Sequence, residues 1–129
     1  MEDFFIENKI YYHDTDCGGV VYYAKYLEHL EEGRAQLCLS RGINLSEYAK
    51  NKVAFAVVHE EADYKSPARC SDTIRIFTQV ERIGNSSISF VQEIKRGDTL
   101  LVKAKTVWAC VGADFKTQTI PDEIRKRLS

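Results

Sequence analysis

The stretch "YYHDTDCGGVVYYAKY", residues 11–26, separates an apolar, aromatic segment from one with the pattern of a helix. Asp14 and Asp16 stand one residue apart in it and are followed by the pair Gly18 and Gly19. Such residues are typical of a tight turn. The first turn of a helix also offers free backbone N–H groups and the positive end of the helix dipole. The stretch therefore predicts either a simple polar turn or a carboxylate placed for chemistry at the start of a helix.

The segments on either side of this stretch predict one long helix and several strands. Residues 22–41 carry apolar side chains at helical spacing, and residues 4–12 alternate between apolar and charged side chains. Four longer segments then show two-residue alternation with β-branched and aromatic residues, as strands do. These segments are residues 53–64, 73–83, 87–96 and 100–111. Two short helical turns are also expected, one with Ser46 as its cap and one with Pro121 in its first turn.

This order of elements predicts an α+β fold for a single domain that spans residues 1–129. One long helix would be wrapped by a curved antiparallel sheet of about five strands, with its apolar stripe on the concave face. The second sheet face and the edge strands would stay exposed, which favours pairing with a copy of the chain. We therefore expect a homodimer or a homotetramer.

Composition and charge exclude several classes of protein. The chain has 44% apolar and 29% charged residues, as globular proteins do, and a net charge of -1 that attracts neither nucleic acid nor anionic membranes. It has no apolar run long enough to span a bilayer, and its acidic N-terminus does not resemble a signal peptide. The four cysteines form no CxxC pair, which argues against a zinc site and favours reduced thiols in the cytoplasm. No metal or other cofactor is expected.

Three segments together resemble the hotdog-fold acyl-CoA thioesterases, in particular the YbgC-like branch of the 4-hydroxybenzoyl-CoA thioesterase family. The most specific is the D-T-D-x-G-G-V-V-Y block of residues 14–22. The D-Y-x-x-P-A-R-x-x-D stretch of residues 63–72 is a second, independent match, and "ERIGNSSISFVQEI" of residues 81–94 follows it. The resemblance implies a hotdog fold and hydrolysis of an acyl-CoA.

The resemblance also assigns roles within the block. It makes Asp16 the catalytic carboxylate, as nucleophile or general base, and the backbone N–H of Tyr23 the oxyanion donor. It places Tyr12 beside the same site. The chemistry is consistent with this placement, since thioester hydrolysis needs a base or nucleophile at the carbonyl carbon and donors at the developing oxyanion. Many relatives have histidine where this chain has Tyr23, and tyrosine is a poor base near neutral pH.

Substrate-binding residues are expected around this centre. Gly19 would let a thioester approach the backbone closely, and Tyr26 would contact the acyl group along the helix stripe. Basic residues near loops would meet the phosphates of coenzyme A, and a turn where relatives approach the pantetheine arm would complete the site. The candidates for these last two roles are Lys65, Arg69, Arg82, Ser86 and Ser87.

Other polar residues have simpler interpretations. Asp14 is expected to shape the turn, and Cys17 to act as a small filler. The histidines, residues 13, 29 and 59, show no metal-ligand spacing and are expected on the surface or in the sheet. Glu31 and Arg34 stand three residues apart near the apolar stripe, and an ion pair between them is favoured over a catalytic role for Glu31.

Three other functions share features with this sequence. A haloacid-dehalogenase-type phosphatase would use Asp14 as its nucleophile, but it requires a larger parallel α/β domain, and Gly18 stands where its motif has threonine or valine. A hotdog dehydratase acting on acyl carrier protein generally needs a histidine at the helix start, where this chain has none. A dimer that binds an acyl carrier protein or an envelope complex with weak catalysis stays open, and Tyr23 is the residue that favours it.

Overall fold

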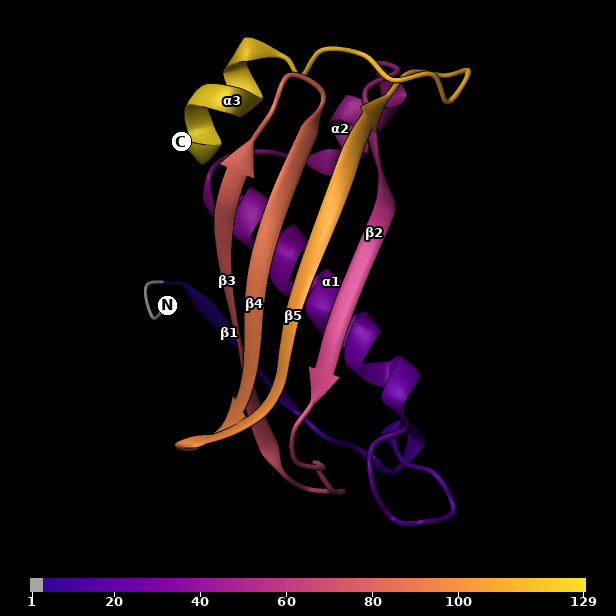
Figure 1. Ribbon diagram of the computed structural model, residues 1–129, viewed down its shortest axis with the longest axis vertical. Helices are drawn as coiled ribbons and strands as arrows, with labels where there is room; N and C mark the ends of the chain where they lie inside the picture. Colours follow the sequence, from indigo (N-terminus) through magenta and orange to yellow (C-terminus); the bar gives the residue numbers. More distant parts are fainter. Residues whose placement is uncertain (1–3) are drawn as a thin grey trace.

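The computed structural model describes residues 4–129, and its main element is one antiparallel sheet of five strands. The strands are β1 (Phe5–Lys9), β2 (Ala54–Tyr64), β3 (Thr73–Ile83), β4 (Ser87–Arg96) and β5 (Thr99–Val111). They lie in the order β1-β3-β4-β5-β2, and every neighbouring pair is antiparallel. Strands β1 and β2 are therefore the two edges of the sheet, which Figure 1 shows as one curved layer.

The long helix α1 (Tyr23–Ser40) crosses one face of this sheet (Figure 1). It approaches the strands closely at Gly33, where an added Cβ would lie only 2.8 Å from Ile76 Cγ2 and from Thr78 Oγ1. A methyl group there would force the helix or these side chains to shift, so the helix backbone packs closely against the side chains of β3. The expected α+β hotdog arrangement, with one long helix on a curved sheet of five strands, is confirmed.

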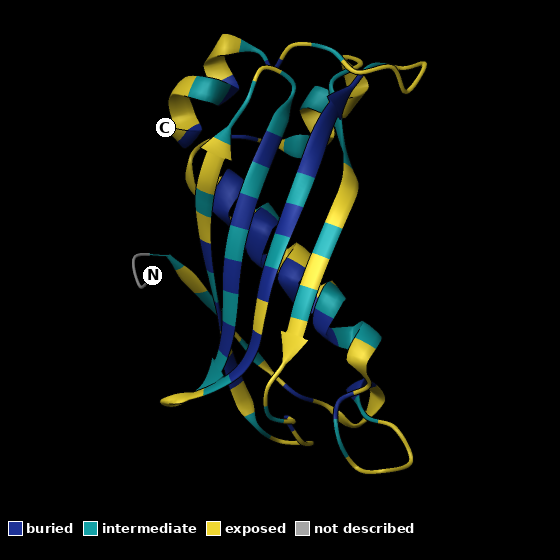
Figure 2. Cartoon of the chain, in the orientation of Figure 1, coloured by how far each residue is buried: buried dark blue, intermediate teal, exposed yellow. Residues whose placement is uncertain are grey.

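The apolar core between α1 and the sheet has two parts. The part near the start of α1 includes Tyr26, Leu30, Ile74, Ile76 and Ile94. The part near its end includes Leu37, Phe90, Trp108, Ile120 and Ile124. Figure 2 shows the buried bands of α1, β4 and β5 facing one another, whereas β2 is largely exposed. The two parts thus bury both halves of the helix stripe that the sequence predicts.

The first strand is shorter than the expected residues 4–12. It ends at Lys9, and Tyr12–Asp14 form a single 3-10 turn, η1. The cause lies in Asp14, whose Oδ2 accepts the backbone N–H of Tyr11 at 2.9 Å. This local side-chain bond replaces the ladder bond that a longer strand would make.

The two short helices form where they were expected, with a correction at the start of each. Helix α2 (Leu45–Lys50) is capped by Asn44, whose side chain accepts the N–H of Glu47 at 3.2 Å, so the prediction of Ser46 as the cap is wrong. Helix α3 (Asp122–Leu128) begins directly after Pro121, which is its N-cap, so the prediction of Pro121 in the first turn is wrong by one residue. No helix within residues 4–129 has the length and apolar character needed to cross a membrane.

A buried polar cluster lies beneath the second half of α1. Arg34 Nη1 donates to Gln92 Oε1 at 3.0 Å and to Thr106 Oγ1 at 3.1 Å. Its ion pair is with Glu60 of β2, at 3.9 Å, rather than with Glu31, which is exposed. The expected Glu31–Arg34 pair is therefore wrong, because Arg34 points to the sheet. Burial lowers the pKa of Arg34, and the charge of Glu60 opposes that effect.

Candidate active site

The loop that carries Asp16 is closed by backbone hydrogen bonds. Asp16 N donates to Val20 O and Gly19 N donates to Asp16 O, both at 3.0 Å. Asp16 Oδ1 accepts the N–H of Gly18 at 2.8 Å, which orients the carboxylate at the exposed tip of the loop. Gly19 makes the turn with φ of 78°, a conformation that other residues rarely adopt. The sequence block thus folds into a tight loop with an oriented, exposed carboxylate.

Helix α1 starts directly after this loop and has an uncapped end. The N-cap residue of α1 is Tyr22, and no side chain within residues 4–129 caps this end by accepting a backbone N–H. The first turn of the helix contains no acidic residue. The N–H of Tyr22 donates to Asp14 O at 2.9 Å and that of Lys25 to Tyr22 O at 2.8 Å, which leaves the N–H groups of Tyr23 and Ala24 at the helix end. This end is suited to an oxyanion, because it combines free donors with the positive end of the helix dipole.

The loop after β2 lies beside the Asp16 loop. Val21 N donates to Ala68 O at 2.9 Å, and Val20 forms a bridge with Arg69. From the helix side, the buried hydroxyl of Tyr26 accepts the N–H of Ala68 at 2.9 Å. The two sequence motifs, residues 14–22 and 63–72, therefore meet at one end of the sheet.

A hollow of about 230 Å³ opens between these loops and α1. Its walls are Val21, Tyr23, Tyr26, Tyr64, Lys65, Ser66 and Pro67. The Tyr23 ring meets that of Tyr64 edge to face, with centroids 6.3 Å apart, and the Tyr26 and Tyr64 centroids are 5.7 Å apart. An apolar or aromatic group would contact ring surface on more than one side of this hollow.

Two phenols of the hollow, Tyr26 and Tyr64, and the neighbouring Tyr22 have raised pKa values and stay protonated near neutral pH. The hydrogen bond with Tyr23 raises the pKa of Tyr22, and the charge of Asp16 adds to that effect. Burial raises the pKa of both Tyr26 and Tyr64. These side chains can donate hydrogen bonds, whereas a carboxylate such as Asp16 is the base available at this end of the molecule.

The predicted site residues divide into two groups. Asp16, Gly19, Tyr23, Tyr26, Lys65 and Arg69 lie at the end of the sheet just described, and Tyr12 is next to them in η1 with a side chain that is 84% exposed. Arg82, Ser86 and Ser87 lie at the other end, where β3 turns into β4. The ends of β3 are roughly 30 Å apart, since a strand residue advances about 3.3 Å. One chain does not bring the second group to Asp16.

The sequence interpretation missed a polar groove on the other side of the Asp16 loop. It has a volume of about 430 Å³ between β1, η1 and α1, and His29 is one of its buried residues. The expectation of surface or sheet positions is met by His13 and His59 and is wrong for His29, which lies in α1. Its spacing of three from Tyr26 and four from Gly33 placed it on the buried stripe and was the available signal. Within residues 4–129, no three His, Cys, Asp or Glu side chains are grouped to hold a metal ion.

Comparisons with known proteins agree with this arrangement. Residues 11–128 match the model of the thioesterase-like superfamily. An Escherichia coli protein named acyl-CoA thioester hydrolase YbgC is 32% identical over 90% of this chain and 88% of its own length. A 1,4-dihydroxy-2-naphthoyl-CoA hydrolase of Nostoc punctiforme is 31% identical over 88% of this chain and 78% of its own.

Solved structures show the same fold. A hypothetical protein of Aquifex aeolicus superposes with a TM-score of 0.94, at 22% identity, over 98% of this chain and all of its own. The region that matches the family model, residues 11–128, contains both sequence motifs and the start of α1. The resemblance noted in the sequence is therefore confirmed: this chain belongs to the thioesterase-like superfamily, with YbgC acyl-CoA thioesterases among its relatives.

Proposed function

We propose that the chain hydrolyses the thioester of an acyl-CoA, with Asp16 as its catalytic carboxylate. The observation that carries this proposal is the oriented, exposed carboxylate of Asp16 on a tight loop that leads into the uncapped start of α1. Membership of the thioesterase-like superfamily supports the reaction type. The names of the Escherichia coli and Nostoc punctiforme relatives support a coenzyme A thioester as the substrate.

In the proposed reaction, the thioester carbonyl oxygen accepts the N–H of Tyr23 at the helix start. Asp16 either adds to the carbonyl carbon or takes a proton from a water that adds there. Negative charge develops on the carbonyl oxygen and is stabilised by the helix N–H. The C–S bond then breaks, the thiolate of coenzyme A leaves and is protonated, and the acid is released. On the nucleophilic route, water first hydrolyses the mixed anhydride formed with Asp16.

The substrate would extend from Asp16 into the hollow and along the adjacent loop after β2. The hollow lined by Tyr23, Tyr26 and Tyr64 supports the acyl group, whose contacts there are apolar and aromatic. Lys65 lines the same hollow and Arg69 lies in the adjacent loop, both exposed. These two cations support binding of the coenzyme A phosphates. An acyl carrier protein in place of free coenzyme A would present the same phosphopantetheine end.

We further propose that the active form is a homodimer joined along β2. This strand pairs only with β5 among the described strands, and Val57 and Val58 on it are 51% and 62% exposed. An exposed apolar edge strand is a ready partner for a second copy. Antiparallel pairing of two β2 edges would put the turn with Ser86 and Ser87 of one copy at the same end of the joint sheet as Asp16 of the other. Light scattering at micromolar concentration is expected to give a dimer or tetramer, and a monomer would contradict this.

The decisive experiment is the Asp16→Asn variant, assayed by loss of thioester absorbance on short, long and aromatic acyl-CoAs. Asparagine keeps the shape and removes the carboxylate, so kcat is expected to fall by about a thousandfold or more. The matched control is Asp114→Asn, since Asp114 also accepts an N–H two residues ahead, that of Lys116, on an exposed loop. It is expected to keep full activity. Unchanged turnover in Asp16→Asn would rule out the catalytic assignment.

Two further results refine the proposal. Tyr23→His restores the side chain that many relatives carry, and we expect it to raise kcat if the tyrosine limits the reaction. The backbone N–H at this position survives the change, so loss of all activity would contradict a donor role for it. Absence of turnover on every acyl-CoA and acyl carrier protein tested would instead favour the role as a binding dimer.

A further inference from the structure

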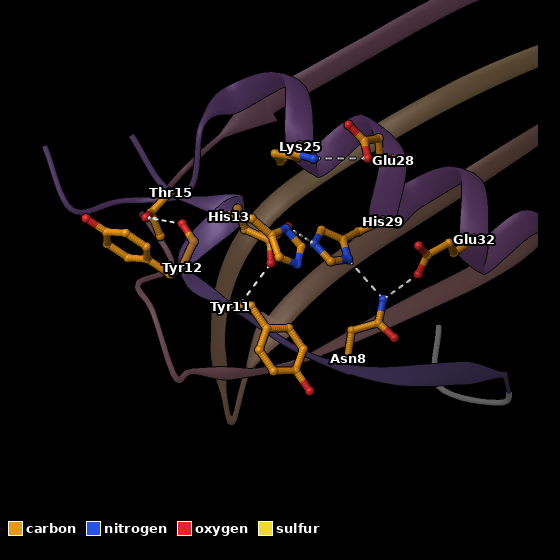
Figure 3. A network of polar contacts seen from close by, with 10 residues as sticks. Asn8, Tyr11, Tyr12, His13, Thr15, Lys25, Glu28, His29 and Glu32 are labelled. Carbon is orange, nitrogen blue, oxygen red and sulfur yellow. Dashed lines mark hydrogen bonds and ion pairs between the residues drawn. The ribbon is translucent and has the colours of Figure 1, made fainter. Parts of the chain in front are cut away.

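The groove between β1, η1 and α1 contains a chain of polar contacts that the reaction proposed above does not use. Figure 3 shows His29 reaching from α1 toward Asn8 of β1, with Glu32 on the far side of Asn8 and His13 on the near side of His29. These contacts lead to Asp14, two residues before Asp16. They therefore connect the middle of the helix with the loop that carries the proposed catalytic carboxylate.

Asp14 is a buried carboxylate that requires compensation. The residue is 4% exposed, and its Oδ2 accepts the N–H of Tyr11 at 2.9 Å. Its Oδ1 lies 3.6 Å from His29 Nε2 and 3.6 Å from His13 Nδ1, distances of electrostatic contact rather than of a hydrogen bond. The His13 side chain is 72% exposed, whereas that of His29 is 10% exposed. Water screens the first contact, so His29 is the stronger of the two.

The contacts of Asn8 decide which nitrogen of His29 carries the proton. Asn8 Nδ2 lies 2.8 Å from Glu32 Oε1 and 2.9 Å from His29 Nδ1. A carboxylate oxygen only accepts, so the amide nitrogen of Asn8 is the donor to Glu32. The same nitrogen then donates to His29 Nδ1, which must be unprotonated. In the neutral ring the proton is consequently on Nε2, and it points toward Asp14 Oδ1.

Asp14 in turn connects the two sides of the catalytic loop. Its side chain accepts from Tyr11 before the loop, and its backbone O accepts the N–H of Tyr22 at 2.9 Å after the loop. Tyr22 directly precedes Tyr23, the proposed oxyanion donor. His29 lies six residues farther along the same helix. The loop thus contacts α1 at two points, at its N-cap residue Tyr22 through a backbone hydrogen bond and farther along through the imidazole of His29.

We infer that His29 is a positioning residue for thioester hydrolysis: oriented by Asn8, its Nε2–H points at Asp14 Oδ1, 3.6 Å away, and this contact between a dipole and a buried charge sets the place of Asp16 relative to the start of α1. This inference rests on the function proposed above. A shift of the carboxylate relative to the oxyanion donor slows the reaction, and displacement by about 1 Å is worth up to about a hundredfold. Binding of the acyl group, which uses the hollow on the other side of the loop, is not affected.

The test compares His29→Phe with His13→Phe, a matched pair because both rings lie 3.6 Å from the same oxygen of Asp14. His29→Phe is expected to lower kcat about tenfold with KM changed less than about twofold, as expected for partial misplacement. His13→Phe is expected to keep kcat within about twofold, as an exposed contact does. Full kcat in folded His29→Phe, or equal losses in both variants, overturns the inference.

A conservative variant separates positioning from mere filling of space. Glutamine places an amide N–H close to the position of Nε2, so His29→Gln is expected to recover most of the kcat that His29→Phe loses. Failure of His29→Gln to exceed His29→Phe contradicts the role of the donor. If His29→Phe does not fold, Asn8→Leu decides instead, since it removes the amide that orients the ring. It is expected to lower kcat severalfold, and unchanged kcat overturns the inference.

Two readouts do not depend on turnover. Nitrogen-15 spectra in mildly alkaline solution are expected to show His29 as the Nε2–H tautomer, and a proton on Nδ1 overturns the inference. Hydrogen exchange of the Tyr22 amide, which donates to Asp14 O, is expected to accelerate in His29→Phe and not in His13→Phe. Unchanged exchange of the Tyr22 amide in His29→Phe overturns only the inference about His29. Unchanged turnover of Asp16→Asn overturns the proposed function. The two failures are therefore distinguishable.

Discussion

Two polar clusters lie beneath α1, and they differ in what they join. The cluster near the helix start, around His29 and Asp14, borders an open groove and connects the helix to a loop. The cluster under its second half, around Arg34, connects the helix to the sheet through Gln92 and Thr106. Both bury a charged group, which is costly unless partners compensate it.

The difference is one of sequence separation. Arg34 reaches residues that are 58 and 72 positions away, whereas Asn8 and His29 are 21 positions apart. The Arg34 cluster can exist only when helix, β4 and β5 have assembled, so its loss weakens the whole fold. The His29 cluster joins neighbouring segments around the Asp16 loop, so its loss displaces that loop. One cluster supports stability and the other supports the geometry of the proposed site.

The largest expected effect is on stability, from Arg34→Met. It removes the donor to Gln92 and Thr106 and leaves Glu60 without its cation, and we expect unfolding to become easier by about 3 kcal/mol. The measurement is urea unfolding, with turnover per folded molecule recorded in parallel. Arg75→Met is the matched control, because its ion pair with Glu7 is half exposed and is worth about 0–1 kcal/mol. A large loss of kcat in folded Arg34→Met would remove the distinction between the two clusters.

Gly33→Ala tests the close contact between helix and sheet beside the same cluster. The added methyl would lie 2.8 Å from Ile76 Cγ2 and 3.0 Å from Gln92 Nε2, so the helix or these side chains must move. Overpacking of this kind is expected to lower the free energy of unfolding by about 1–3 kcal/mol. Gln36→Ala, at an exposed position of the same helix, is the control, with a change within about 0.5 kcal/mol. Equal stability of the two variants would show that the helix has room to shift.

Tyr26→Phe tests the attachment of the loop after β2 at the other end of the helix. It leaves the N–H of Ala68, a fully buried residue, without its acceptor, and the expected loss is about 1–2 kcal/mol. Thermal unfolding measures it, with Tyr11→Phe as a control at a side chain that is 56% exposed. An unchanged melting temperature would mean that the loop is held without this bond.

The effect that is smallest at neutral pH concerns a buried thiol and appears only in alkaline solution. Burial raises the pKa of Cys38, on the buried side of α1, from 9.0 to about 11. The folded state therefore favours the neutral thiol, and this stabilisation is fully present below pH 9 and is lost as the pH rises toward about 11. The free energy of unfolding is expected to fall over this interval less steeply in Cys38→Ala than in the original chain. Equal slopes for Cys38→Ala and the original chain would show that burial does not raise the pKa of this thiol.

Much of the fold was predictable because its signals are local. Two-residue alternation gave the long strands, and the apolar spacing gave the helix within one residue at each end. The errors in the ends of helices and strands arose where a side chain could form a hydrogen bond with any of several nearby backbone groups. Asn44, not Ser46, caps α2, and Asp14 ends β1 by accepting the N–H of Tyr11. Such choices depend on small differences between alternative hydrogen bonds, which spacing does not reveal.

The candidate site was predictable in part for the same reason. The Asp16 loop and the start of α1 are contiguous in the chain, so the block of residues 14–22 carries their geometry within itself. The ion-pair partner of Arg34 could not be predicted in this way, because Glu60 comes close to Arg34 only when β2 joins the edge of the sheet. The burial of His29 likewise depends on β1 and η1 closing over the first half of the helix.

The sequence by itself determined the order of strands and helix and the tight loop at Asp16, because each follows from local periodicity or from contiguous residues. It indicated the class of protein through the resemblance of its motifs to a known family. The tertiary structure alone decided which charges are buried and what compensates them. It joined the loop after β2 to the Asp16 loop, directed Arg34 to Glu60, and placed His29 against Asp14. The physical reason is that a buried charge selects its partners by proximity in space, which the fold creates only after the strands have paired.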